Sequence, residues 1–149
     1  NVGREQETFL NFVVKFYDKL PNEIIFLPTP LDKYDRFQRF KNILRNGDVS
    51  SEIDPWSRRL QDDDNFTLNN YQNRDVKPAE TRPFKNWYEK HIGEWNPLKH
   101  MSFNGIYRTT RDKILERSRE NFKSLHKQIQ NCDDCEVTHY LERSMSSIY

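Results

Sequence analysis

The chain has 149 residues, which is the size of one ordinary domain. Hydrophobic residues make up 34% of it and charged residues 32%, so we expect a small core in which aromatic side chains supply much of the buried area. The net charge of +1 excludes a strong overall attraction for nucleic acid, and the longest apolar run has four residues, far too few to cross a bilayer.

The N-terminal residues predict an α/β arrangement. Apolar side chains from Phe9 to Leu20 recur at spacings of three and four over a wide arc, which indicates a largely buried helix that Pro21 ends. Residues 24–27 are apolar at every position, which is typical of a central strand buried on both faces of a covered sheet. This order of elements, helix, tight turn and buried strand, is that of an α/β fold.

The rest of the chain predicts further helices, one more strand and one long loop. A second, shorter helix is expected over residues 34–44, closed at Gly47. Residues 48–80 show no sustained apolar period, so we expect a long surface loop anchored by aromatic residues such as Trp56. Later elements are a strand within residues 101–108 and helices over residues 81–93, 110–130 and 137–148. We therefore expect a single helix-rich α/β domain over residues 1–149, with a few-stranded sheet and flanking helices.

The two cysteines, Cys132 and Cys135, form a single CxxC. Zinc would need two further ligands, and the nearest candidates are His126 and His139. A redox CxxC normally opens a helix after a strand, whereas this pair follows a long predicted helix. We interpret the pair as a loop with free thiols or with one local disulfide, and we predict no metal ligands in the chain.

Other motifs also have alternative interpretations. The four glycines are scattered, which excludes a glycine-rich phosphate loop. Residues 62–64 are three aspartates, as in some metal sites, but no buried strand precedes them, so we interpret them as a solvated acidic loop. Residues 81–130 contain 11 basic and 5 acidic residues, which indicates either a solvated helix face or a surface for an anionic partner. Asn65 begins an Asn-Phe-Thr glycosylation sequon, which would be used in the secretory pathway.

Three segments carry more specific information. The first is residues 1–5 (Asn-Val-Gly-Arg-Glu), followed by Tyr-Asp-Lys-Leu-Pro at residues 17–21. The second is residues 103–114, and the third is residues 139–143 (His-Tyr-Leu-Glu-Arg). In this order they resemble the eukaryotic family known as domain of unknown function 3431. Its pattern is N-x-G-R-E, then Y-D-x-L-P, then an F-x-V-S-R-like strand entering a helix, and finally G-H-Y-L-E-R-x-W.

The chain departs from this pattern at Phe9, Thr138 and Met145, where the family has Tyr, Gly and Trp. The family also has strand-forming sequence before its first motif, so the resemblance implies that this chain is the C-terminal part of a larger domain. The family is similar to distant nucleotide-sugar glycosyltransferases of the α/β type. The resemblance therefore implies sugar transfer from a nucleotide sugar to a glycan or small-molecule acceptor, with a divalent metal as cofactor if the domain is a transferase.

The two most specific motifs supply the candidate site residues. An inverting sugar transfer needs a carboxylate to take the proton of the acceptor hydroxyl, and a cation to stabilise the departing diphosphate. Glu142 and Glu5 are the candidate bases, and His139 lies three residues before Glu142 on the same helix face. Arg4 and Arg143 are the candidate phosphate partners, because a guanidinium forms paired contacts with phosphate oxygens.

Asn1 and Gly3 belong to the same opening segment and complete the candidate ligand-binding set. Two alternatives remain open. The four charged residues of the two motifs could pair across two helices in a buried ion network that performs no chemistry. The chain could also be a non-catalytic domain that binds a partner through residues 48–80 or through the basic face of the 110–130 helix.

Overall fold

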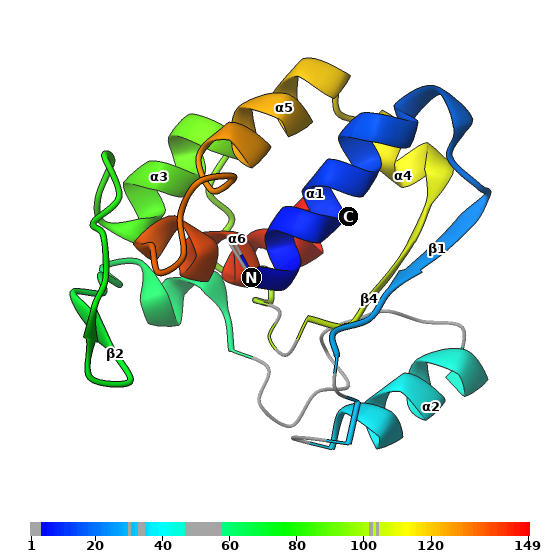
Figure 1. Cartoon of the computed structure of the whole chain (residues 1–149), viewed down its shortest axis with the longest axis horizontal. Coiled ribbons are helices and arrows are strands. Elements are labelled where there is room, and N and C mark those ends of the chain that lie inside the picture. The colour runs from blue at the N-terminus through cyan, green and yellow to red at the C-terminus, as the bar shows by residue number, and fades with distance from the viewer. Residues whose placement is uncertain (1–3, 30, 33–34, 47–57, 102, 104) are drawn as a thin grey trace.

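The computed structural model describes residues 4–29, 31–32, 35–46, 58–101, 103 and 105–149. Within them the chain forms a helix-rich α/β fold, as the sequence predicts. In Figure 1, α1 crosses the middle of the molecule between α5 and α6, the paired strands β1 and β4 lie to one side, and α3 lies opposite. The principal elements are α1 (Arg4–Phe16), β1 (Glu23–Phe26), α2 (Arg36–Asn46), β2 (Asn70–Tyr71), β3 (Arg74–Asp75), α3 (Phe84–His91), β4 (Tyr107–Thr110), α4 (Arg111–Leu115), α5 (Arg119–Lys127) and α6 (Glu136–Ile148).

Helix α1 follows the predicted apolar pattern. Phe9, Leu10 and Val13 are buried on its inner side, where the helix packs against α5 and α6. The helix gives way to a short 3-10 helix at Tyr17–Lys19 before Pro21, whose ring cannot continue an α-helix.

Helix α6 is the most deeply buried element. Every described residue of this helix except Glu142 and Ser146 is buried. It contacts α1 on one side and α3 on another, so it forms the centre of the core rather than a surface layer. The polar side chains that α6 carries into the core must therefore find partners inside the protein.

The sheet differs from the expectation. Strand β1 pairs in antiparallel register with β4, with Phe26 opposite Tyr107, and this sheet has two strands. Ile24 and Phe26 are buried, whereas Ile25 between them is partly exposed. The prediction of a strand buried on both faces was therefore wrong, because a two-stranded sheet has only one face against the core. Strand β4 also begins later than expected, near the end of the predicted 101–108 segment.

The predicted helix over residues 110–130 is divided into α4 and α5. Ser118 caps α5, its hydroxyl accepting a hydrogen bond from the Asn121 amide. A serine at this position favours a new helix start over an uninterrupted helix, which explains the break.

The expected long loop is more ordered than predicted. From Arg58 onward it forms a 3-10 helix (Leu60–Asp63) and the β2–β3 hairpin, and Leu60 has no exposed surface. Trp56, Gly47 and residue 34 lie outside the described residues. Among the residues that are described, no helix is long and apolar enough to cross a membrane.

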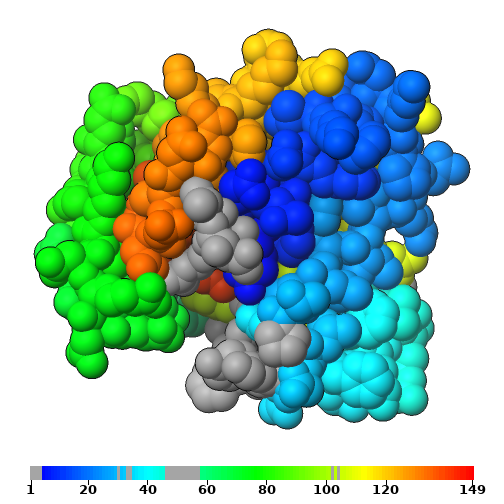
Figure 2. Space-filling model, in the orientation of Figure 1, coloured from blue at the N-terminus to red at the C-terminus, as the bar shows by residue number. Residues whose placement is uncertain are grey.

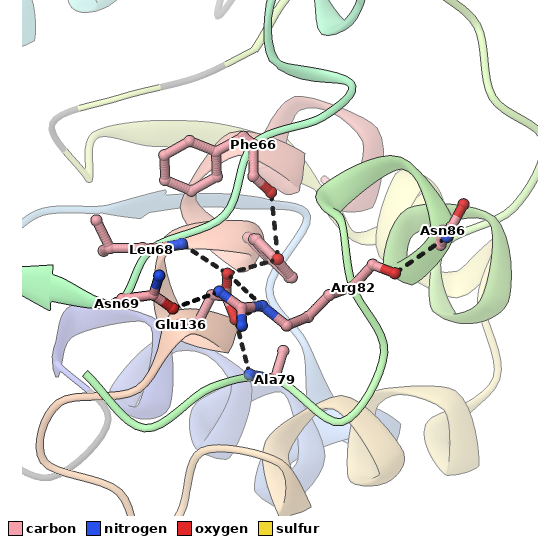
Figure 3. Close-up of polar contacts among 8 residues, drawn as sticks. Phe66, Leu68, Asn69, Ala79, Arg82, Asn86 and Glu136 are labelled. Atoms are coloured by element: carbon pink, nitrogen blue, oxygen red, sulfur yellow. Dashed lines mark hydrogen bonds and ion pairs between the residues drawn. The ribbon is translucent and has the colours of Figure 1, made fainter. Parts of the chain in front are cut away.

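A buried carboxylate joins this irregular segment to α6. Glu136, at the first position of α6, has no exposed surface and accepts hydrogen bonds from the backbone amides of Leu68 (2.7 Å) and Ala79 (2.8 Å). The Arg82 guanidinium lies 2.9 Å from the same carboxylate (Figure 3). The Tyr140 hydroxyl also donates to it, at 2.8 Å. Its negative charge also lies at the positive end of the helix dipole. Glu136 therefore holds residues 68–82 against the start of α6.

Glu136→Gln should lower the free energy of unfolding by about 3 kcal/mol, because it places an amide NH₂ among hydrogen-bond donors and leaves the Arg82 charge without its partner. Urea unfolding at neutral pH measures this loss. The matched control is the exposed Glu80, for which Glu80→Gln should change stability by less than about 0.5 kcal/mol. Equal effects of the two substitutions would contradict the structural role of Glu136.

A candidate ligand-binding cleft between α1 and α6

A polar cleft of about 1010 Å³ lies between the start of α1 and the first half of α6. The β2–β3 hairpin, the loop before α6, the residues after β1 and the start of α2 form its other walls. Figure 2 views this face, with the start of α1 in dark blue at its centre and the loop before α6 in orange beside it. The volume is at the upper end of the range typical of small-molecule sites, roughly 300–1,000 Å³.

The structure brings Glu5 and Glu142 to this one cleft. Glu5 lies in the first turn of α1, and its Oε1 atom is 3.6 Å from the Arg36 guanidinium. Glu142 is one of the two residues of α6 that are not buried, and Thr138, one turn earlier, lines the cleft beside it. Side chains four residues apart share a helix face, which explains why both reach the same wall.

The other predicted site residues are placed differently. Asn1 and Gly3 lie outside the described residues, and Arg4 begins α1 with a side chain that the structure does not describe. His139 is buried, and its ring lies 4.9 Å from the Tyr71 ring, centroid to centroid. Tyr71 lines the cleft, whereas His139 is not one of its lining residues.

Arg143 lies in a buried ion pair. Its Nε atom is 2.7 Å from Oδ2 of Asp63, and the guanidinium packs 3.7 Å from the centre of the Phe66 ring. The Arg58 guanidinium contacts the other Asp63 oxygen at 2.6 Å. The prediction of a solvated acidic loop was therefore wrong for Asp63, whose carboxylate is buried between two arginines. Arg143 thus lies in a buried ion pair, as the structural alternative expected, but its partner is Asp63 and not a residue of the two motifs.

Residues that the sequence did not single out supply the remaining charges of the cleft. Arg36 comes from α2, and Arg74 comes from β3, where it pairs with Asp134 at 2.9 Å. Asp133 and Asp134 come from the CxxC loop. No local pattern marks these residues, because the cleft is formed by segments that are distant in the sequence.

The β2–β3 hairpin turns through Gln72 and Asn73, which both have left-handed backbone conformations with φ of 52° and 61°. Two positive φ values suit the right-handed twist of a two-residue hairpin. Glycine usually occupies such positions and signals the turn in a sequence; its absence here explains why the hairpin was not predicted.

Both cysteines are buried and free. This agrees with the first of the two interpretations of the pair, a loop with free thiols. Burial, followed by hydrogen bonding with Cys132, raises the pKa of the Cys135 thiol to about 12. Within the part of the chain that the structure describes, no group of three or more His, Cys, Asp or Glu side chains could hold a metal ion.

The basic face expected on the 110–130 segment is partly internal. The Arg117 guanidinium donates to the backbone carbonyls of Ile92 and Ser147, and Arg119 donates to the carbonyl of Val14. Burial lowers the pKa of Arg117. These two arginines therefore join neighbouring elements of the fold.

Comparisons of the chain with protein-family models, with curated proteins and with solved structures give no match.

Asp63→Asn should lower the free energy of unfolding by about 3 kcal/mol, because it removes the negative charge from between Arg58 and Arg143. Asp64→Asn, next to it in the sequence, should cost less than about 1 kcal/mol, since Asp64 is bonded to the exposed Asn65. Thermal and urea unfolding of the two variants test this difference. If Asp63→Asn is as stable as the wild type, the buried ion pair contributes nothing to the free energy of unfolding.

The raised pKa of Cys135 gives a pH dependence of stability with a definite sign. The folded state favours the neutral thiol. The stability that this preference contributes is fully present below the ordinary pKa of 9.0 and is lost as the pH rises from 9 towards 12. Between pH 9 and 11 the free energy of unfolding should fall more steeply for the wild type than for Cys135→Ala. If the free energy of unfolding falls equally with pH in the wild type and in Cys135→Ala, the raised pKa of Cys135 is contradicted.

Proposed function

We propose that the cleft between α1 and α6 binds a nucleotide sugar and that the chain is part of a glycosyltransferase-like domain, which transfers the sugar to an acceptor hydroxyl. The observation that carries the proposal is that Glu5 and Glu142, from two motifs at opposite ends of the chain, line one polar cleft. The resemblance to the 3431 family, with its similarity to glycosyltransferases, supplies the substrate class.

The chemistry of the cleft walls supports a polar ligand. Carboxylates, hydroxyls, amides and two guanidiniums line it, and the Tyr71 ring provides one aromatic surface. Aromatic faces beside hydrogen-bonding groups suit a sugar ring, which presents C–H bonds on its faces and hydroxyls at its edge. Arg36 and Arg74 are the cations that a diphosphate would meet in the cleft, in the place that the sequence assigned to Arg143.

In this proposal Glu142 is the general base. Its carboxylate takes the proton of the acceptor hydroxyl while that oxygen forms a bond to the anomeric carbon of the donor. The bond from the anomeric carbon to the diphosphate oxygen breaks, and its electron pair leaves with the diphosphate. The described residues contain no cluster suited to a divalent metal, so no step is assigned to one.

A second function is favoured by one specific observation. His139 and Arg143, two of the residues expected to take part in chemistry, are engaged in buried packing and ion pairing. A domain that binds a sugar ligand without turning it over would need the cleft but neither of these groups. Binding without transfer is therefore the alternative to an active transferase.

The test measures binding and turnover separately in the wild type and in Glu142→Gln. Under the proposal, calorimetry with a panel of UDP- and GDP-sugars detects at least one ligand, and Glu142→Gln binds it with similar affinity. Turnover of that donor with an acceptor should fall by about 10²-fold or more in the variant, because the base is lost. Glu94→Gln, an exposed change shortly after the end of α3 and outside the lining of the cleft, is the control and should leave both quantities unchanged.

Circular dichroism must show that Glu142→Gln is folded, which we expect because Glu142 is not buried. Binding of a nucleotide sugar without any turnover in the wild type would favour the non-catalytic alternative. If the wild type binds none of the nucleotide sugars, the proposed function is wrong.

A further inference from the structure

Gln6 is a buried polar residue in the wall of the cleft. It lies on α1, one residue after Glu5, and only 3% of its surface is exposed. Its Oε1 atom is buried and has no hydrogen-bond partner among the described residues. A buried acceptor without a donor destabilises a protein, so such a group in a native structure calls for an explanation.

The groups of α6 that line the cleft near Gln6, Thr138 and Glu142, are acceptors of hydrogen bonds. The Thr138 hydroxyl gives its hydrogen to the Cys135 carbonyl at 2.7 Å, so towards the cleft it can only accept. The guanidinium donors of the cleft, Arg36 and Arg74, come from other elements, α2 and β3. One wall of the cleft therefore accepts hydrogen bonds through the Gln6 amide oxygen, the Thr138 hydroxyl and the Glu142 carboxylate.

Such a wall favours a ligand that donates hydrogen bonds. A neutral sugar carries several hydroxyl donors, whereas a phosphate group at neutral pH carries mostly acceptors and a negative charge. The carboxylates near Gln6 would repel a phosphate and would attract a hydroxyl. The wall formed by Gln6, Thr138 and Glu142 therefore suits a sugar ring, and it leaves the diphosphate to the sides of the cleft that hold the arginines.

We propose that Gln6 is a specificity-determining residue whose side-chain oxygen accepts a hydrogen bond from a hydroxyl of the neutral acceptor sugar beside Glu142. The amide turns about its last side-chain torsion, which is soft for glutamine, and presents Oε1 to the ligand. The inference rests on the proposed function, since it assigns the acceptor to one wall of the same cleft. It also explains why the protein retains an unpartnered buried acceptor on α1.

The first experiment needs no ligand. Gln6→Met keeps the length of the side chain and removes the unpartnered acceptor, so the melting temperature Tm should rise. The matched control is Gln128→Met, because Gln128 accepts a hydrogen bond from the Trp87 indole at 2.9 Å and its loss should lower Tm. A lower Tm for Gln6→Met would show that Gln6 is bonded within the protein, and it would overturn the inference.

The second experiment measures ligand binding by NMR chemical-shift titration. The probes are UDP, a UDP-sugar and four neutral sugars: D-glucose, D-galactose, D-mannose and N-acetyl-D-glucosamine. Gln6→Met should weaken the binding of the preferred neutral sugar by about tenfold, the effect of one hydrogen bond in a site built for it, and should leave UDP unaffected. Gln6→Glu, which keeps an acceptor at this position, should retain more of the affinity than Gln6→Met.

The outcomes separate this inference from the proposed function. If the UDP-sugar binds but Gln6→Met binds every neutral sugar as the wild type does, the proposed function stands and the role of Gln6 is wrong. If a neutral sugar binds in a manner that depends on Gln6 while no nucleotide sugar binds, the role of Gln6 stands and the donor assignment is wrong. If the wild type binds none of the four neutral sugars, the inference is overturned.

Discussion

The structure depends on satisfying the charges that α6 brings into the core. This helix is buried along nearly its whole length, yet it carries a carboxylate at its first position and a guanidinium in its second half. Glu136 receives its donors from residues 68–82, and Arg143 receives Asp63. The least periodic part of the sequence therefore fixes the most buried helix. By fixing α6, these contacts also set the wall of the cleft that presents Thr138 and Glu142.

The periodic elements could be predicted because a helix face repeats within a few residues. The spacing of apolar side chains located α1 and α6. The strand at residues 23–26 was located correctly, but its surroundings were not, since apolar residues alone do not tell how many strands a sheet has. The order in residues 58–82 could not be predicted, because its cause lies in donors and acceptors more than 50 residues away in the sequence.

The candidate site shows the same division between local and distant signals. The motifs pointed to Glu5 and Glu142, and the fold brings both to one cleft. The same motifs could not show that Arg143 pairs with Asp63, since an acidic triplet looks alike whether it is solvated or buried. Gln6, Tyr71 and the two arginines of the cleft follow from the tertiary structure alone. Motifs thus identified two carboxylates of the cleft, and only the fold identified the groups that surround them.

The contact between Tyr71 and His139 has a spectroscopic consequence. The hairpin that carries Tyr71 is joined to the body through the Arg74–Asp134 ion pair, whose arginine is largely exposed. The magnetic shielding from the tyrosine ring acts on the neighbouring imidazole protons and falls off steeply with the separation of the two rings. The resonances of His139 therefore report the position of the hairpin relative to α6.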